Sequence, residues 1–240
     1  MSHVAIPKLA ASVILLRRTE TNGFEIFFTR RPDSMPVLGG MYCYPGGTLR
    51  KEDSSVRSIE RCAGLSAEQA RKVVGAQFRP AQALGLWIAG IRELFEEVGV
   101  LLAVADSGSR LAMDAERAAR LAAKHRAMLN RGTDFSALLK SESLRCDLSQ
   151  LAYFSHWQTP AQVPARFDTY FFLAVMPADQ TPLPASYEVA HSLWLTPDRA
   201  LRLFSGGELP MIFPTFACLR TLADFDSLEG LFKEYFSHRS

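Results

Sequence analysis

Arg92-Glu-Leu-Phe-Glu-Glu-Val-Gly-Val100 gathers one guanidinium and three carboxylates between apolar stretches of the chain. At about 100° per residue in a helix, these four charged side chains lie within an arc of roughly 140°. The apolar side chains of the segment fill a separate arc of about 120°; they are Leu84, Trp87, Ile88, Ile91, Leu94, Phe95 and Val98. The pattern predicts an amphipathic helix with one buried stripe, and Gly99 suits a left-handed cap at its carboxyl end.

The charge order along this predicted helix is unfavourable at one point. Arg92 precedes Glu96 by four residues, which is attractive, whereas Glu93 precedes Glu97 at the same spacing and repels it. A solvated helix face would mix charge signs to gain such attractions. Spacing alone leaves two interpretations open, namely a solvated acidic face or a site where a divalent cation offsets the repulsion.

Composition limits the class of protein. The chain has 240 residues, of which 48% are hydrophobic and 22% charged, as is typical of a globular protein with a sizeable core. The net charge of +2 is too small to favour nucleic acid or an anionic membrane as the main partner. The apolar run 10–16 is too short to span a membrane and continues into two arginines, so we expect a strand there.

The cysteines give the expected compartment. Cys43, Cys62, Cys146 and Cys218 lie far apart and form no C-x-x-C pair. Such spacing predicts reduced thiols, not a disulfide framework or a zinc site. We therefore expect a cytoplasmic protein.

Strands and helices alternate irregularly along the chain. Alternating or β-rich runs predict strands at 11–17, 24–30, 151–158, 167–176 and 192–195. Helical patterns cover 54–77, the segment from about Pro80 onward, 114–130, the residues after Thr196-Pro197, and 214–222. The irregular order favours a mixed sheet between helices over a regular parallel winding.

The segment 92–100 also carries a family resemblance. It resembles the second half of the Nudix box, G-x5-E-x7-R-E-U-x-E-E-x-G-U with U a bulky apolar residue. Every fixed position of that half is matched, by Arg92, Glu93, Leu94, Glu96, Glu97, Gly99 and Val100. Gly47, preceded by Pro45-Gly46, matches the opening glycine. The sequence is thus identified as a member of the Nudix hydrolase family.

The first half of the box departs from the family pattern in two ways. Asp53, with Glu52 beside it, stands where the family has glutamate. Residues 54–91 separate Asp53 from Arg92, where the family has seven residues. An insertion at this place resembles the branch that includes the peroxisomal coenzyme A diphosphatases of mammals. The stretch 27–47 is also similar to that branch, although it lacks the second arginine found in other coenzyme A pyrophosphatases.

The resemblance implies an architecture. We expect an α/β (α+β) protein with the Nudix α/β/α sandwich and a mixed β-sheet. Residues 1–240 would form one domain with helical insertions at about 54–80 and 106–146. Because the box helix must bury its stripe against the sheet, the insertion before it should pack at the edge, near the site. It and the helix at 114–130 would form either a wall for a long substrate or a dimer interface.

The chemistry of the box suits a metal-assisted hydrolysis. A diphosphate repels nucleophiles, and Mg²⁺ prefers a few carboxylates together with water and substrate phosphate. By analogy with the family, Glu96 and Glu97 are the principal ligands of Mg²⁺ or Mn²⁺, and Glu93 is a ligand or a proton acceptor. A backbone carbonyl of Gly46 or Gly47 would add a further oxygen.

Arg92 is expected to orient an acidic neighbour, Asp53, and not to touch the ion. The general base is not part of the box; Glu188, before Trp194, is our candidate, although it would otherwise be an ordinary surface carboxylate. Arg30, Arg31 and Arg166 are candidates for contact with the substrate.

The predicted activity is hydrolysis of the diphosphate linkage of a nucleoside diphosphate derivative, with coenzyme A or acyl-coenzyme A as favoured substrates. ADP-ribose, other nucleotide sugars and dinucleotides remain open, as does a binding module on the Nudix fold that has lost catalysis. Degenerate modules usually lose one of the paired glutamates, and this chain keeps them. Capped RNA is disfavoured by the near-neutral charge. The predicted partner is therefore a small nucleotide, with a homodimer as a further possibility.

Overall fold

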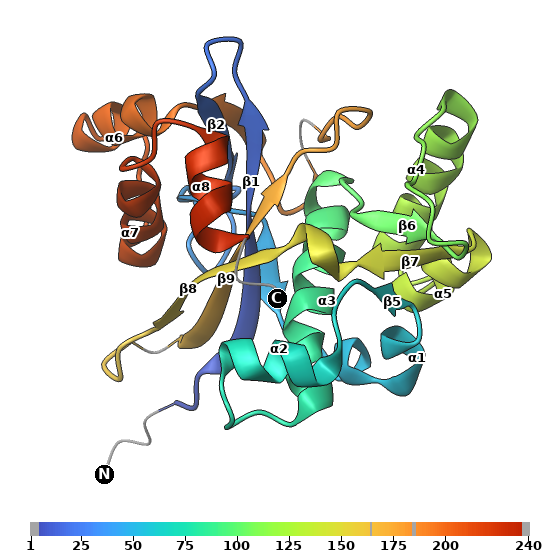
Figure 1. The fold of residues 1–240 in the computed structure, drawn as a ribbon. Helices are drawn as coiled ribbons and strands as arrows, with labels where there is room; N and C mark the ends of the chain where they lie inside the picture. The colour runs from blue at the N-terminus through green and yellow to red at the C-terminus, as the bar shows by residue number, and fades with distance from the viewer. Residues whose placement is uncertain (1–4, 164, 184–185, 237–240) are drawn as a thin grey trace.

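The computed structural model describes residues 5–163, 165–183 and 186–236, and its centre is a mixed sheet (Figure 1). The strand order is β10 (His191–Leu195), β2 (Phe24–Arg30), β1 (Lys8–Arg18), β9 (Phe167–Val175) and β8 (Ala152–Gln158). Short strands β3 (Tyr42–Cys43) and β4 (Gly46–Thr48) pair with β2 and β1. Only the pair β1–β9 is parallel among these described strands, so the mixed sheet predicted from the sequence is confirmed.

Strand β1 occupies the middle of the sheet because its side chains are apolar in both directions. Residues 10–16 are all buried. Val13 and Leu15 belong to the core on the side of helix α3 (Pro80–Val98), whereas Ile14 and Leu16 belong to the core on the opposite side. A strand that alternates between two apolar layers must be covered on both faces.

Helices supply both covers. Helix α3 lies on one face, and α6 (Pro197–Ser205), α7 (Phe213–Leu222) and α8 (Leu228–Tyr235) lie on the other (Figure 1). The α/β/α sandwich is therefore confirmed. Helix α3 starts with Pro80 in its first turn and ends at Gly99, whose φ of 71° makes the predicted left-handed cap. Gly90 lets α3 approach β1, since a Cβ there would lie 3.3 Å from Val13 Cγ2.

The two inserted regions are not purely helical. The first contains α1 (Val56–Ile59), β5 (Cys62–Ala63) and α2 (Ala67–Val74), and the second contains α4 (Ala115–Leu129), α5 (Phe135–Ser141) and β7 (Leu144–Asp147). With β6 (Ala103–Ala105) they build a small sheet in the order β5-β7-β6. This sheet joins segments that are far apart in sequence, and it packs beside α3 (Figure 1).

Most predicted elements are present, but the shortest were missed. The strands β3 to β7 and the helices α5 and α8 had no counterpart in the sequence prediction. The continuous helical pattern expected at 54–77 is two short helices separated by β5. In the part of the chain that the structure describes, no helix has the length and apolar character needed to cross a bilayer.

Candidate active site

The candidate site forms where helix α3 packs against strand β4. Strand β4 pairs with β1 through Gly46 and Gly47, and α3 presents its carboxylates to this turn. A Cβ on Gly47 would lie 2.6 Å from Glu93 Cδ, and one on Gly46 would lie 2.5 Å from the Ala11 carbonyl oxygen. Only glycine allows the helix carboxylates and this backbone to approach so closely.

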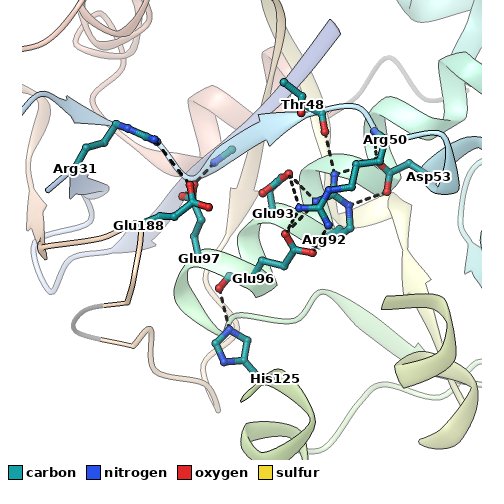
Figure 2. A network of polar contacts seen from close by, with 11 residues as sticks. Arg31, Thr48, Arg50, Asp53, Arg92, Glu93, Glu96, Glu97, His125 and Glu188 are labelled. Atoms are coloured by element: carbon teal, nitrogen blue, oxygen red, sulfur yellow. Dashed lines mark hydrogen bonds and ion pairs between the residues drawn. The ribbon is translucent and has the colours of Figure 1, made fainter. Parts of the chain in front are cut away.

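Arg92 and Asp53 form a buried ion pair at one end of the site (Figure 2). Arg92 Nε donates to Asp53 Oδ1 at 2.7 Å, and Nη2 donates to Oδ2 at 2.9 Å. The same guanidinium reaches the Thr48 carbonyl oxygen at 3.0 Å and Glu93 at 2.6 Å. Burial lowers the pKa of Arg92, but these acidic partners outweigh it, so the pKa is raised overall. The expected neighbour of Arg92 is therefore Asp53, across the insertion, whereas Glu52 is exposed.

Glu93 and Glu97 lie buried in the middle of the site; Arg92 and Arg50 lie close to Glu93, whereas Glu97 forms no ion pair within the described residues. The exposed fractions of Glu93 and Glu97 are 7% and 5%. Burial raises the pKa of Glu97 well above its ordinary value, and the carboxylates of Glu93 and Glu188 raise it further. Burial likewise raises the pKa of Glu93, although Arg92 opposes this increase. The backbone N–H of Gly46 donates to Glu97 Oε2 at 3.3 Å, which is a long contact for so buried an anion.

Arg50 is a site residue that the sequence did not single out. Its guanidinium forms two hydrogen bonds of 2.7 Å with the carboxylate of Glu96 and lies 3.8 Å from Glu93. Its backbone N–H donates to Asp53 Oδ2 at 2.8 Å, which fixes the turn from which it extends. The spacing of Arg50 from Gly47 carries no periodic signal, so only the folded turn reveals its direction.

Of the residues proposed for base and substrate contacts, Glu188 and Arg31 come to the site. Arg31 Nη2 lies 3.8 Å from Glu188 Oε2, and Figure 2 shows both beside Glu97. Arg30 instead pairs with Asp33 at 2.7 Å. The choice between the two arginines was open because adjacent strand residues point to opposite faces of the sheet.

Arg166 does not reach the site, so its expected role there is not supported by the structure. Its guanidinium donates to the carbonyl oxygens of Thr159, at 3.1 Å, and Ala5, at 2.8 Å. These bonds fasten the start of β9 to the N-terminal segment. Neither Arg166 nor Arg30 lines the cavity described next.

A cavity of about 470 Å³ opens beside the carboxylates. Glu93, Arg31, Arg50 and Glu188 provide charge at one side, and Trp157, Phe167 and Phe171 provide aromatic walls. Such a cavity combines a polar end with a large apolar surface, as small-molecule sites generally do. No residue of the segment 54–90 lines it, so the first insertion is not a wall of this cavity.

The oxygen donors suit a hard divalent cation. Three glutamates and a glycine turn present the ligand type that Mg²⁺ and Mn²⁺ prefer, and two of the glutamates are buried with raised pKa values. In the described part of the chain, no three acidic, histidine or cysteine residues are already grouped around one point. Arg50 and Arg92 hold Glu96 instead, so a cation would have to compete with guanidinium groups for this ligand.

Comparison with solved structures defines the class. A crystal structure of a Nudix hydrolase from Alicyclobacillus acidocaldarius is 26% identical to this chain and covers 96% of it and 97% of its own chain, with a TM-score of 0.77. The fold is thus the Nudix fold that the box implied.

Comparison with sequence families narrows this further. The chain belongs to the NUDT19 Nudix domain family, whose model matches residues 4–222. Two curated proteins named acyl-coenzyme A diphosphatase NUDT19 are similar to it. The Gallus gallus protein is 28% identical over 88% of this chain, and the Homo sapiens protein is 32% identical over 61%. The matched regions cover 64% and 41% of those proteins, so the chain spans less than two thirds of the length of these relatives.

Proposed function

We propose that this protein is a metal-dependent hydrolase that cleaves the diphosphate linkage of coenzyme A or an acyl-coenzyme A. One observation carries the proposal: the three glutamates of the second half of the box lie on one face of α3, against the Gly46-Gly47 turn and beside a cavity of about 470 Å³. The names of the Gallus gallus and Homo sapiens relatives support the substrate class.

Glu93, Glu96, Glu97 and the Gly47 carbonyl oxygen would hold Mg²⁺ or Mn²⁺. When bound, the ion supplies positive charge to the phosphate oxygens and lowers the pKa of a water molecule. Burial makes Glu93 and Glu97 poor anions without a cation, as their raised pKa values indicate. Occupation of the site would therefore relieve an unfavourable feature of the protein itself.

The remaining residues of the site position groups or accept a proton. Arg92, locked by Asp53, fixes the rotamer of Glu93 through a hydrogen bond of 2.6 Å. Glu188 lines the cavity with an exposed carboxylate and is our candidate to take the proton from the attacking water. Arg31 orients Glu188 from 3.8 Å and also faces the cavity, where it would meet a phosphate oxygen.

Arg50 has a second role in this scheme. Its guanidinium is 48% exposed and lines the cavity, so it is free to turn from Glu96 to an incoming diphosphate. Release of Glu96 by Arg50 would provide one ligand to the cation, and the guanidinium would then neutralise phosphate charge. The two events are coupled because one side chain serves both.

The test is a substrate panel with Mg²⁺ or Mn²⁺, read by mass spectrometry. Coenzyme A and acyl-coenzyme A should yield 3′,5′-ADP and a 4′-phosphopantetheine or its acyl derivative, faster than ADP-ribose, a nucleotide sugar or a dinucleotide is cleaved. Faster cleavage of one of these competitors would replace the proposed substrate. No cleavage of any compound with either metal would favour a binding module.

Two further expectations belong to this proposal, namely a cytoplasmic location and no nucleic acid partner, and a homodimer is a further possibility. Light scattering at micromolar concentration tests the dimer, and localisation of the tagged full-length protein tests the compartment. A gel-shift experiment with single-stranded RNA at physiological salt tests the absence of nucleic acid binding, since a near-neutral protein should bind it weakly.

A further inference from the structure

A second cavity lies at the carboxyl-terminal end of α3. It has a volume of about 610 Å³ and opens between α4 and residues of 179–183 together with Ser186 and Tyr187. Phe95 and Gly99, from the end of α3, form its floor. Its lining is mainly aliphatic, with Met113, Leu121, Leu129 and Leu183 among the contributors. The proposed diphosphatase activity has no assigned use for this space.

Helix α4 presents small apolar side chains to this groove. Ala115, Ala118 and Ala122 line it and are solvent-exposed, and Leu129, 46% exposed, continues the same face. The buried residues Leu121 and Met128 pack the helix into the protein core. Leu121 also lines the groove, so the apolar surface that holds α4 in place continues outward into the exposed residues of the groove.

The walls of the groove are fixed to the box helix and the residues that follow it. The Gln180 side chain donates to the Leu101 carbonyl oxygen at 2.8 Å and accepts from its N–H at 2.9 Å. The Leu183 N–H donates to the Val98 carbonyl oxygen at 2.9 Å. On the α4 side, His125 Nε2 lies 2.9 Å from the Glu96 carbonyl oxygen. The groove is thus largely preformed, which lowers the entropic cost of binding.

The groove adjoins the proposed reaction centre at two points. Phe95 in its floor precedes Glu96, and Ser186 and Tyr187 in its wall precede Glu188. The Ser186 hydroxyl oxygen is shielded from solvent and has no hydrogen-bond partner within the described residues. A buried hydroxyl without a partner is unfavourable, and a ligand carbonyl oxygen would satisfy it.

The two cavities differ in chemistry as the two arms of an acyl-coenzyme A differ. The cavity of about 470 Å³ has arginines and aromatic rings, which suit a phosphorylated nucleotide. The groove of about 610 Å³ is lined mainly by aliphatic side chains, which suit a saturated chain. Glu93 lines the first cavity, and Phe95 and Gly99, close to it in sequence, line the second, so a diphosphate held at the carboxylates could extend one arm into each.

We propose, building on the function proposed above, that the groove between α4 and the described residues of 179–183, 186 and 187 binds the acyl chain of an acyl-coenzyme A. Ser186 donates a hydrogen bond to a carbonyl oxygen of the arm that carries this chain. The enzyme consequently selects substrates by chain length. The chain fills an apolar groove that would otherwise be hydrated, and each buried methylene increases kcat/KM up to the length that the groove holds.

The experiment compares groove-filling variants with matched controls on the same helix. Ala118→Trp and Ala122→Trp fill the groove, whereas Ala119→Trp and Ala123→Trp change exposed α4 residues that do not line it. The measurement is kcat/KM with Mg²⁺ for coenzyme A and for its acetyl, octanoyl and palmitoyl esters. In the natural protein we expect a gain of about fourfold per buried methylene.

The groove-filling variants should lose the rise of kcat/KM with chain length but cleave coenzyme A at the natural protein's rate. The control variants should retain the rise of kcat/KM with chain length. Calorimetry of octanoyl-coenzyme A with Glu97→Gln and with Glu97→Gln/Ala118→Trp checks binding without turnover. The double variant should bind it no more tightly than coenzyme A.

Two results would overturn the inference and are distinguishable from each other. If Ala118→Trp keeps the chain-length preference while coenzyme A is still cleaved, the groove is not the acyl site. Light scattering then shows whether it is instead an interface between copies, in which case Ala118→Trp lowers the molecular mass. If no coenzyme A compound is cleaved by the natural protein, the proposed function fails, and this inference fails with it.

Discussion

The two ends of the polar face of α3 are equally buried but differ in how much opposite charge surrounds them. At the first end, Arg92 is 3% exposed and meets Asp53 in two short hydrogen bonds. At the other end, Glu97 is 5% exposed and, among the described residues, accepts one hydrogen bond, from a backbone N–H at 3.3 Å. The carboxylates of Glu93 and Glu188 raise its pKa, and Arg31 opposes them less strongly. Since burial is the same, the difference lies in the available counter-charge.

This difference separates a structural contact from a binding site. A buried charge with a complete set of partners holds the surrounding segments in register, here the residues before the first insertion and the helix after it. A buried anion without such partners raises the free energy of the folded protein unless a cation binds. The Arg92 end therefore positions the helix, and we expect the Glu97 end to bind the ligand.

The largest expected effect follows the loss of charge at the unbalanced end. Glu97→Gln should lower kcat/KM about a thousandfold, because removal of one metal ligand removes several kcal/mol of transition-state stabilisation. The melting temperature without metal should not fall, since the variant removes an unfavourable buried charge. Steady-state kinetics at saturating Mg²⁺ and thermal unfolding measure the two quantities.

Glu234→Gln, on helix α8 and away from the site, is the matched control and should change neither quantity. Near-normal turnover of Glu97→Gln at saturating Mg²⁺ would remove Glu97 from the set of ligands.

The second effect concerns the end of the face with the Arg92–Asp53 ion pair and should appear mainly in the stability of the fold. Asp53→Asn should cost about 3 kcal/mol of unfolding free energy, because it leaves the Arg92 guanidinium buried with too little counter-charge. Activity of the folded fraction should fall less than in Glu97→Gln. Urea unfolding provides the free energy.

Glu52→Gln changes the exposed neighbour and is the control, with an expected change of less than about 0.5 kcal/mol. If Asp53→Asn unfolds like the natural protein but loses as much activity as Glu97→Gln, the division between the two ends is wrong.

The sequence predicted the box helix well because its signals are local. A stripe of apolar residues with helical period, Pro80 at the start and Gly99 at the end are sufficient to set α3, and the structure has these boundaries. The contact between Asp53 and Arg92 was expected from the family pattern, and the structure has this contact although a long segment separates the two residues. The family resemblance predicted this long-range contact, whereas hydrophobic periodicity carries no information about it.

The missed features depend on contacts between distant segments. Strands β5 and β7 are two and four residues long, too short for an alternating pattern, and they exist because the two insertions meet. Arg50, Arg31 and Arg166 are alike in sequence as cations near predicted turns. Their partners are Glu96, Glu188 and backbone carbonyls, and only the path of the folded chain assigns them.

A third, smaller effect concerns Glu96, in the middle of the polar face of α3, whose carboxylate is paired with Arg50. Arg50→Ala should tighten Mn²⁺ binding roughly threefold to tenfold, because Glu96 loses a charged competitor. It should also lower kcat/KM about tenfold through the lost contact with the diphosphate. Calorimetry with Mn²⁺ and steady-state kinetics measure the two effects, which have opposite directions.

Arg31→Ala is the control for a general change of charge, since Arg31 lies near Glu97 but makes no hydrogen bond to Glu96. An equal gain in Mn²⁺ affinity in both variants would show that charge alone, and not competition for Glu96, sets the affinity.

The smallest expected effect is a pH dependence of metal stabilisation. Without metal, the folded-state pKa of Glu97 is above its ordinary value of 4.5, mainly through burial. The folded protein then holds a proton that the unfolded chain releases, so the contribution of Glu97 to stability is fully present below pH 4.5 and is lost as pH rises through the folded-state pKa. Metal binding needs the ionised carboxylate and cancels this loss, so Mn²⁺ should raise the melting temperature more at pH 8 than at pH 5. Thermal unfolding at both values, with and without Mn²⁺, measures the difference. In Glu97→Gln it should shrink, and an unchanged pH dependence there would place the responsible charge elsewhere on the face.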